Sequence, residues 1–426
     1  MSCTPPASAE GSPRLSLPVV PARPTVVRPS RMGKWRALSL IAIHVAFLVH
    51  VLHWKATGRT LSPVEPSESM ESLATGRVNA GALFFAAALA STLLFGRFLC
   101  GWGCHMVAVQ DLCGWLMRRA GFRPKPFRSR LLVFVPLGAA IYMFIWPTAY
   151  RLWVGAPPPP VTTHLFKSQF WATFPGPVVA VLTLLICGGA IVYFLGNKGF
   201  CTYACPYGGF FGLLDRAAPL RVRVTDACNR CGHCSAACSS NVRVAEEVHL
   251  FKMVVDPGCM KCLDCVSVCP NDALYVGLGR PALAAPRAAQ PRKPLRHDGG
   301  WGTELALLAI FGVSLLVWRG LYGQVPFLFS LGLSSITAYL LLRLWHLASR
   351  ADVTFHRLAL RRRGTIRPAG WAYVVAALLL LAFLAHCGWV QFNQAGGDAA
   401  FSPAPRARQA SRRWSRAGSS RRRSTR

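Results

Sequence analysis

The sequence predicts a mainly α-helical membrane protein that carries a small inserted domain. Its 426 residues are 53% hydrophobic and only 15% charged, with a mean hydropathy of +0.35, which is too apolar for a soluble protein of this length. Apolar runs of about 20 residues, long enough to cross a bilayer, recur along the chain. A stretch dense in cysteine lies between the fourth and fifth runs. We therefore expect six or seven transmembrane helices with one domain inserted among them.

The N-terminal half begins with a tail and continues with apolar runs. Residues 1–33 are rich in Pro, Ser and Arg without periodicity, so they are predicted to be a disordered tail. No short apolar segment with a small-residue cleavage site precedes the first long run, so we expect no removed signal peptide. Residues 34–199 are the predicted four-helix membrane domain. Its apolar runs cover residues 35–54, 79–99, 131–150 and 177–195.

Charges in the connecting segments set the expected orientation. The chain through Arg36 holds six basic residues and one acid, whereas the loop at residues 55–78 holds three of each. A basic excess marks the cytoplasmic side of a membrane. We therefore expect the N-terminal tail inside and the first loop outside. After four crossings, the cysteine-dense stretch is then on the cytoplasmic side.

Three further apolar runs follow a linker at residues 281–300 that is rich in Pro, Ala and Arg, so residues 301–392 are predicted to be C-terminal membrane helices. The loop from Arg343 to Arg367 holds seven basic residues and one acid and is expected inside. Seven crossings would leave the basic tail at residues 393–426, which is predicted to be disordered, on the outside. Basic segments are instead expected on the cytoplasmic side. The predicted number of spans is therefore six or seven.

Eight cysteines in the inserted domain form two runs with one shared spacing. The runs are Cys228-x2-Cys231-x2-Cys234-x3-Cys238 and Cys259-x2-Cys262-x2-Cys265-x3-Cys269. In bacterial ferredoxins with this spacing, three cysteines of a run bind one [4Fe-4S] cluster and the fourth binds the other cluster. The pattern therefore assigns cluster 1 to Cys228, Cys231, Cys234 and Cys269, and cluster 2 to Cys259, Cys262, Cys265 and Cys238.

The flanking sequence suits an α+β bacterial-type 2[4Fe-4S] ferredoxin domain within residues 200–280. The β-prone runs at 251–255 and 273–276 are expected to form strands. Zinc is the alternative, because paired Cys-x2-Cys units also make tetrahedral zinc sites. Each run here has a third and a fourth cysteine at ferredoxin offsets, which favours clusters over zinc.

Two more cysteine pairs follow the second and fourth apolar runs, namely Cys100-x3-Cys104 and Cys201-x3-Cys205. Cysteines four apart share a helix face, and two such pairs could converge into a four-thiolate site. That site could hold a metal or an extra cluster, or cycle between dithiol and disulfide. The structural alternative is small apolar thiols packed at helix ends, and the sequence leaves both open. The similar flanks of the pairs suggest a repeated two-span unit.

Histidines in or near the first span are candidates for contact with a quinone. His50 and His53 are three residues apart near its outer end, so they share a helix face. Because histidine is costly in hydrocarbon, a functional role is the starting hypothesis, and an imidazole can hydrogen-bond a quinone oxygen and accept its proton. Haem ligation by paired histidines is less favoured. The structural alternative is a histidine at the water interface.

Several function classes are excluded by what the sequence lacks. It contains no Rossmann fingerprint, P-loop or nucleophile elbow, which argues against a soluble nucleotide-driven enzyme. The net charge of +32 could suggest nucleic acid, but the charge is split among many loops and no nucleic-acid module is present. We therefore expect a lipid bilayer, and no nucleic acid, as the partner of the basic segments.

Taken together, the two Cys-x3-Cys pairs and the two ferredoxin runs resemble the membrane-bound polyferredoxins over residues 80–280. This family includes the quinol-dehydrogenase subunit NapH, the C-terminal region of NosR and the oxidase-assembly protein CcoG. The resemblance implies a bacterial inner-membrane protein that passes electrons between the quinone pool and a partner redox protein, as the electron-transfer subunit of a quinol dehydrogenase-type complex. The alternative that it implies is an assembly or maturation factor that reduces a metal ion or disulfide on a client metalloenzyme.

The chain departs from the family pattern in two places. His105 follows Cys104 where the family has proline, which puts a function of the first pair in doubt. The three C-terminal apolar runs exceed the simplest four-span members. The partner of any named member is therefore not carried over to this chain.

Overall fold

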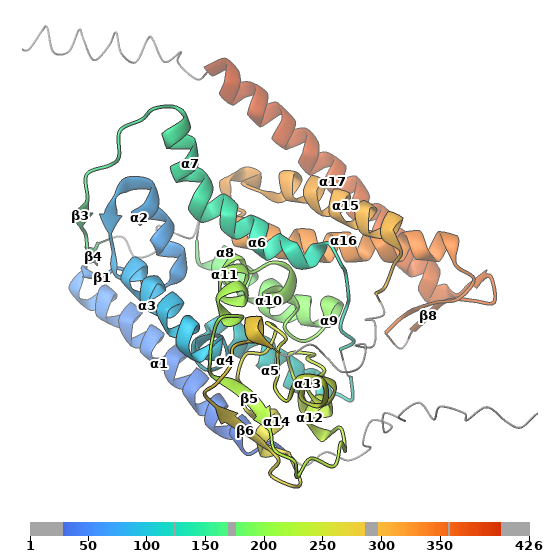
Figure 1. The fold of residues 1–426 in the computed structure, drawn as a ribbon. Helices are drawn as coiled ribbons and strands as arrows, with labels where there is room; N and C mark the ends of the chain where they lie inside the picture. The colour runs from blue at the N-terminus through green and yellow to red at the C-terminus, as the bar shows by residue number, and fades with distance from the viewer. Residues whose placement is uncertain (1–28, 123, 169–175, 286–296, 357, 402–426) are drawn as a thin grey trace, which may run out of the picture.

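The computed structural model describes residues 29–122, 124–168, 176–285, 297–356 and 358–401, and Figure 1 shows their arrangement. Most of the predicted N-terminal tail, the centre of the linker and the end of the C-terminal tail lie outside the described residues. The structure is mainly helical, with a small ferredoxin-like part at one end of a helix bundle. The predicted fold class is confirmed.

Six described helices are long and apolar enough to cross a membrane. Two of them are interrupted by π-helical turns, so they comprise several elements. The six are α1 (Met32–Thr57), the segment Leu132–Trp153, the segment Pro177–Leu195, α15 (Trp301–Trp318), α16 (Phe327–Ser349) and the Pro368–Gly397 part of α17 (Pro368–Phe401). The interrupted segments comprise η2 (Leu132–Phe134), α6 (Val135–Ala140), η3 (Ile141–Ile145) and α7 (Trp146–Trp153), then α8 (Pro177–Leu184), η5 (Leu185–Ala190) and α9 (Ile191–Leu195).

A shorter apolar helix, α3 (Ala80–Phe95), also runs through the bundle. Its 16 residues span about 24 Å, less than the roughly 30 Å of a hydrocarbon core. The Leu94 carbonyl at its end accepts a hydrogen bond from the Leu220 amide beside the ferredoxin-like part, so α3 returns the chain to that end. With α3, the described chain traverses the bundle seven times. The last helix continues to Phe401, past the predicted boundary at residue 392.

Short elements close the end of the bundle that faces away from the ferredoxin-like part (Figure 1). The strands form two small ladders, one antiparallel and one parallel. These elements are β1 (Thr60–Leu61) paired with β4 (Phe166–Lys167), β2 (Arg77–Val78) paired with β3 (Thr162–Thr163), and the helices η1 (Pro66–Glu68) and α2 (Ser69–Thr75). A turn, η7 (Leu321–Gly323), joins α15 to α16.

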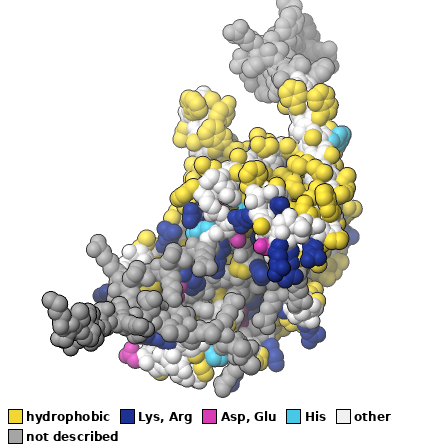
Figure 2. All heavy atoms as spheres, turned by 90° about the vertical axis from the view of Figure 1, so that its right-hand side faces the viewer, with side chains coloured by type: hydrophobic (Ala, Val, Ile, Leu, Met, Phe, Trp, Pro, Cys, Tyr) yellow, Lys and Arg dark blue, Asp and Glu magenta, His cyan; other side chains and the backbone are white. Residues whose placement is uncertain are grey.

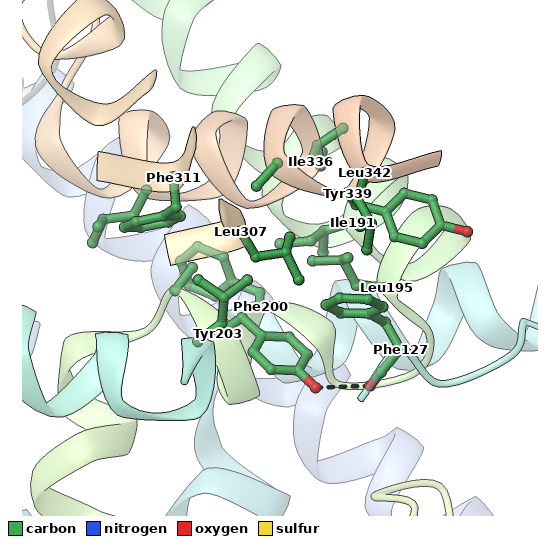
Figure 3. Close-up of a cluster of buried hydrophobic side chains, with 14 of the residues drawn as sticks. Phe127, Ile191, Leu195, Phe200, Tyr203, Leu307, Phe311, Ile336, Tyr339 and Leu342 are labelled. Atoms are coloured by element: carbon green, nitrogen blue, oxygen red, sulfur yellow. Dashed lines mark hydrogen bonds between the residues drawn. The ribbon is translucent and has the colours of Figure 1, made fainter. Parts of the chain in front are cut away.

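The largest buried cluster joins the C-terminal helices to the four-helix part. Figure 3 shows Leu307 and Phe311 of α15 and Ile336 of α16 packed against side chains from α9 and α10 (Gly199–Tyr203). The Tyr203 hydroxyl donates a 2.7 Å hydrogen bond to the Phe127 carbonyl within this cluster. The C-terminal helices are therefore part of one core with the rest of the bundle. A small sheet of β7 (Val353–Phe355), β8 (Leu358–Arg362) and β9 (Thr365–Ile366) joins α16 to α17.

The ferredoxin-like part is built on one antiparallel ribbon, β5 (Arg221–Val224) with β6 (Leu274–Gly277). The strand predicted at 273–276 is confirmed, whereas the strand predicted at 251–255 is wrong. There α13 (Val244–Phe251) ends, and of the following residues Met253 makes an isolated bridge to Arg223. The remaining helices of this part are α12 (His233–Ala237) and α14 (Asp264–Ser267).

Candidate functional site

The first candidate site is a cavity in the ferredoxin-like part. Its cysteine lining comes from both runs, because the fourth cysteine of the second run joins the first three of the first run. The cysteines that line it are Cys228, Cys231, Cys234 and Cys269. The structure thus brings together the four residues assigned to cluster 1.

The second candidate site is a cavity with the reciprocal lining. Cys238 from the first run lies there with the first three cysteines of the second run. The cysteines that line it are Cys238, Cys259, Cys262 and Cys265. The crosswise arrangement is the one that the ferredoxin spacing predicts, so the cysteines assigned to cluster 2 also lie together.

Both runs bend their backbone in the same way around these cavities. Left-handed residues occupy three equivalent positions in or just after each run, although only one of the six is a glycine. The pairs are Arg230 and Lys261 (φ 59° and 51°), Gly232 and Leu263 (φ 79° and 62°), and Asn241 and Asp272 (φ 59° and 46°). Such backbone is costly for residues other than glycine and persists where the surroundings enforce it. The repeated conformation therefore suits two equivalent binding loops.

The donor set fits four-iron clusters better than single metal ions. None of the described cysteines is in a disulfide. Within the described residues, no group of three or more His, Cys, Asp or Glu side chains is arranged to hold one metal ion. Thiolates around an iron-sulfur cube stand farther apart than thiolates on one zinc, because each thiolate binds a different iron. Four thiols spread around a cavity therefore suit a cube.

The two Cys-x3-Cys pairs have matching local structures. Each follows a membrane helix that ends at a left-handed glycine, Gly96 (φ 66°) or Gly196 (φ 90°), and each then enters a short helix, α4 (Phe98–Gly103) or α10. The second cysteine is extended and stands at the N-terminus of the next helix. These next helices are α5 (His105–Arg119) after Cys104 and α11 (Pro206–Asp215) after Cys205. The repeated unit expected from the sequence is thus visible in the backbone.

All four of these cysteines converge. Cys201 is buried in a small cluster with Val107 and Met260, and Cys100 and Cys104 pack against that cluster. Burial raises the pKa of the Cys104 thiol to about 12, and the nearby thiols of Cys201 and Cys100 also raise it. Burial likewise raises the pKa of Cys205 well above its usual value, with Cys201, Cys104 and Cys100 adding to the effect. Every pair among the four thiols therefore interacts.

Polar groups surround this four-thiol cluster. Gln110 donates from Nε2 to the Cys201 sulfur at 3.2 Å. Burial raises the pKa of Cys201, whereas the positive charges of Lys198 and Arg97 oppose that rise. The Arg97 side chain is 6% exposed, and its Nε has no hydrogen-bond partner among the described residues. The cluster is thus a buried set of thiols with cations beside it.

The cluster 2 loop is held against the helix bundle by polar contacts. Arg36 on α1 binds Asp264 at 2.9 Å and Asp111 on α5 at 2.8 Å. Trp102 Nε1 donates to the Lys261 carbonyl at 3.0 Å, and Lys261 Nζ lies 2.7 Å from Asp215 Oδ1. The ferredoxin-like part is therefore seated on α1, α4, α5 and α11.

Sequence reasoning missed these docking residues, although a signal was present. Asp111 and Asp215 are the one acidic residue in α5 and in α11, respectively. A single carboxylate in a helix that has no other acidic side chain is a candidate for an ion pair with a cation of a neighbouring element. Each carboxylate lies in the helix that follows the second cysteine of its Cys-x3-Cys pair, although at a different position in that helix.

The candidate quinone residues lie at the other end of α1. His50 Nε2 lies 3.0 Å from the Leu61 carbonyl oxygen, and His53 Nδ1 lies 2.9 Å from Thr60 Oγ1. Along the helix, His50 is about 21 Å from Arg36, at 1.5 Å per residue. The structure therefore separates these histidines from the cysteine sites.

Family models match the cysteine-bearing parts of the chain. A model described as a 4Fe-4S dicluster domain matches residues 220–270. A second, described as a 4Fe-4S binding domain, matches residues 80–123 and 178–224, the two segments that carry the Cys-x3-Cys pairs. Both descriptions agree with the chemistry of the thiols found there.

Curated relatives match about half of the chain. The ferredoxin-type protein NapH of Haemophilus influenzae is 26% identical over 259 residues, which cover 55% of this chain and 85% of the relative. NapH of Escherichia coli is 28% identical over 231 residues, 51% of this chain and 75% of the relative. The methylamine utilization ferredoxin-type protein MauN of Methylobacillus flagellatus is 27% identical over 229 residues, 50% of this chain and 75% of the relative. No solved structure matches this chain.

Proposed function

Because the chain belongs to the membrane-bound polyferredoxins, a family of iron-sulfur electron-transfer proteins, we propose that it passes electrons between the quinone pool and a partner redox protein. Two [4Fe-4S] clusters would supply one-electron transfer when bound to the assigned cysteines. The membrane is a bacterial inner membrane in this proposal. The chain would act as the electron-transfer subunit of a quinol dehydrogenase-type complex.

The observation that carries the proposal is the unequal burial of the two cysteine cavities. The loop of cluster 2 is turned toward the bundle, with Lys261, Cys262 and Asp264 buried. The loops of cluster 1 are turned outward, with Arg230 and Asn271 exposed. Electrons exchanged with the membrane would therefore pass by way of Cys259–Cys265, and those exchanged with a soluble partner by way of the Cys228–Cys234 loop.

The partner's surface is accordingly proposed to be the exposed rim of the first cavity. Asn229, Arg230, Asn271 and Asp272 are exposed around it. These side chains are polar and of mixed charge, as expected of small, transient electron-transfer contacts. The buried loop of cluster 2 offers no such access, because the membrane helices cover it.

The charge distribution supports a cytoplasmic ferredoxin domain. Figure 2 shows apolar side chains over the upper part of one face and Lys and Arg gathered below them. At the ferredoxin end lie Lys34 on α1, Lys125 and Arg128. At the opposite end, Lys167 is paired with Glu68 and Glu71, so acidic residues offset part of the positive charge there. A basic excess marks the cytoplasmic side.

His50 and His53 are the proposed residues for contact with the quinone head group. Each can accept a proton from a quinol hydroxyl, since oxidation of one quinol releases two electrons and two protons. Their position at the outer end of α1 would direct these protons to that side of the membrane. No haem is part of this proposal.

The test is a quinone-dependent change in iron-sulfur absorbance. Purified protein in lipid nanodiscs would be reduced with dithionite under anaerobic conditions, freed of excess reductant and mixed with a short-chain quinone. We expect reoxidation at a rate that saturates with quinone concentration. A rate indifferent to quinone would overturn the proposal. Loss of one metalloenzyme's cofactor in a deletion strain, together with that indifference, would favour the assembly-factor alternative.

A further inference from the structure

Three side chains with buried, unpartnered nitrogens meet at the C-terminal end of α16. His346 is 2% exposed, and neither of its ring nitrogens has a hydrogen-bond partner among the described residues. Arg343, one turn earlier on the same helix face, has a buried Nε that also lacks a partner there, as does Nε2 of His356 directly after β7. Buried polar groups are normally hydrogen-bonded, so these nitrogens point to a ligand.

Arg343 links the two histidines. His346 lies within electrostatic range of Arg343 and Arg350. Burial lowers the pKa of His356, and the positive charges of Arg343 and Lys125 lower it further, against a hydrogen bond with the Tyr193 backbone. The unpartnered nitrogens of α16 and of the segment after β7 therefore share one positively charged environment.

This positive charge is not balanced by a carboxylate. The ion pairs found among the described residues do not include Arg343, Arg350 or Lys125. Asp298 lies nearby, since its backbone carbonyl accepts a 3.5 Å hydrogen bond from Arg350 Nη2, but its carboxylate accepts from the Arg128 amide. A metal ion would be repelled by these cations, although two histidines are present. An anion fits the site instead, because charged donors bind anions most strongly.

Aromatic rings hold the donor groups in place. The Arg343 guanidinium lies over the Tyr339 ring, 5.1 Å from its centre. The His356 ring packs against Phe122 at 4.7 Å and against Tyr193 at 4.5 Å between ring centres. The donors are therefore fixed before a ligand arrives, which lowers the entropy cost of binding.

The position of the site identifies the anion. His346 lies in the last turn of α16, one of the six helices able to cross a membrane. Trp345 beside it and Trp371 near the start of α17 are both exposed, and tryptophan is enriched at the membrane–water interface. Figure 2 faces the side on which β8 lies in Figure 1, and Lys and Arg gather there below a broad apolar surface. Phosphates of lipid headgroups are the anions found at that depth.

We propose that Arg343, His346 and His356 bind the headgroup phosphate of an anionic phospholipid, in the leaflet that α16 reaches at its C-terminal end. The phosphate oxygens accept hydrogen bonds from Arg343 Nε and from the imidazole N–H groups, while Arg350 and Lys125 add positive charge. Arg343 is half-buried and Arg350 is exposed, so rotation of these two side chains admits the headgroup. The site goes beyond the proposed function and does not depend on it.

The experiment is native mass spectrometry of the full-length protein in detergent, under conditions that remove loosely bound lipid. The probes are phosphatidylglycerol, phosphatidylcholine and inorganic phosphate. We expect one phosphatidylglycerol to be retained per chain, in preference to phosphatidylcholine and without displacement by an equal concentration of inorganic phosphate. Arg343→Gln with His346→Gln should weaken phosphatidylglycerol binding by about tenfold or more.

Arg362→Gln is the matched control. Arg362 is an exposed arginine on β8, so this variant loses the same charge from the same surface and should bind phosphatidylglycerol as wild type does. Arg343→Lys serves if the double variant fails to fold, because it keeps the charge but removes the Nε donor and should bind less tightly than wild type.

Four results would overturn the site. Equal weakening in Arg362→Gln would assign the binding to diffuse surface charge, and unchanged binding in Arg343→Lys would exclude the buried Nε. Equal retention of phosphatidylcholine would remove the preference for an anionic lipid. Displacement by inorganic phosphate at equal concentration would assign the site to a free anion.

Discussion

Lys261 Nζ lies 2.7 Å from Asp215 Oδ1, and this contact joins the loop of cluster 2 to the end of α11. Asp215 is fully buried and also binds Arg221 at 3.1 Å, so one carboxylate balances two cations. Because Lys261 stands between Cys259 and Cys262, the ion pair joins the loop that carries these two cysteines to α11, the helix that follows Cys205.

Asp215→Asn is expected to destabilise the docked ferredoxin-like part. The neutral amide leaves Lys261 and Arg221 buried without a countercharge, which costs about 3–5 kcal/mol. Thermal unfolding in detergent would show a lower melting temperature. The control is Asp226→Asn, which breaks an exposed 3.5 Å pair with Lys252 and should not change the melting temperature. Equal melting temperatures for the two variants would show that the buried network does not hold the domain.

Double variants test the crosswise assignment of the ferredoxin cysteines. Cys238→Ser with Cys262→Ser changes two ligands of the same cavity and should remove one cluster. Cys234→Ser with Cys262→Ser changes one ligand in each cavity and should remove both. The first variant should therefore retain about four more irons than the second, because each cluster holds four. Iron analysis with sulfide determination measures this difference, and equal iron losses would contradict the assignment.

Gly101→Ala is expected to weaken the packing of the cluster 2 loop against α4. The added Cβ would lie 2.2 Å from the Met260 carbonyl oxygen, a backbone atom that cannot rotate away. Overpacking of this kind costs about 1–3 kcal/mol, and the displaced loop should slow reoxidation by quinone. Gly103→Ala is the control, because its nearest neighbour is the mobile end of Leu99 at 3.1 Å. Stopped-flow absorbance would compare the two, and a normal rate in Gly101→Ala would contradict close coupling at this junction.

His50→Phe with His53→Phe tests the proposed quinone contact. Loss of proton-accepting groups should slow quinone-dependent reoxidation by about 100-fold or more, while iron content and reduction by dithionite stay unchanged. His386→Phe is the control, because His386 contacts Tyr322 on the C-terminal helices. A lower melting temperature with a normal rate would assign the two histidines to holding the loop at Thr60 and Leu61 instead.

The cofactor pattern and the spans were readable from the sequence because both are local. The spacing of Cys228, Cys231 and Cys234 reflects the size of the cube that their loop encloses, and span length reflects bilayer thickness. The β-propensity of residues 251–255, by contrast, gave a wrong strand. There α13 continues to Phe251, and Arg221–Val224 pairs with β6 instead. Packing against neighbours overrides the propensity of a short segment.

What the tertiary structure alone decided is which groups meet. Whether Cys100 and Cys104 lie near Cys201 and Cys205 depends on how helices from two distant halves of the chain pack, and spacing within either pair carries no information about that. The same holds for Lys261 and Asp215, whose contact holds the Cys259–Cys265 loop against α11, while Arg230 in the other loop stays exposed. Short-range spacing thus specifies each binding loop. Burial and charge balance over the whole bundle decide which loop packs against the helices and which faces solvent.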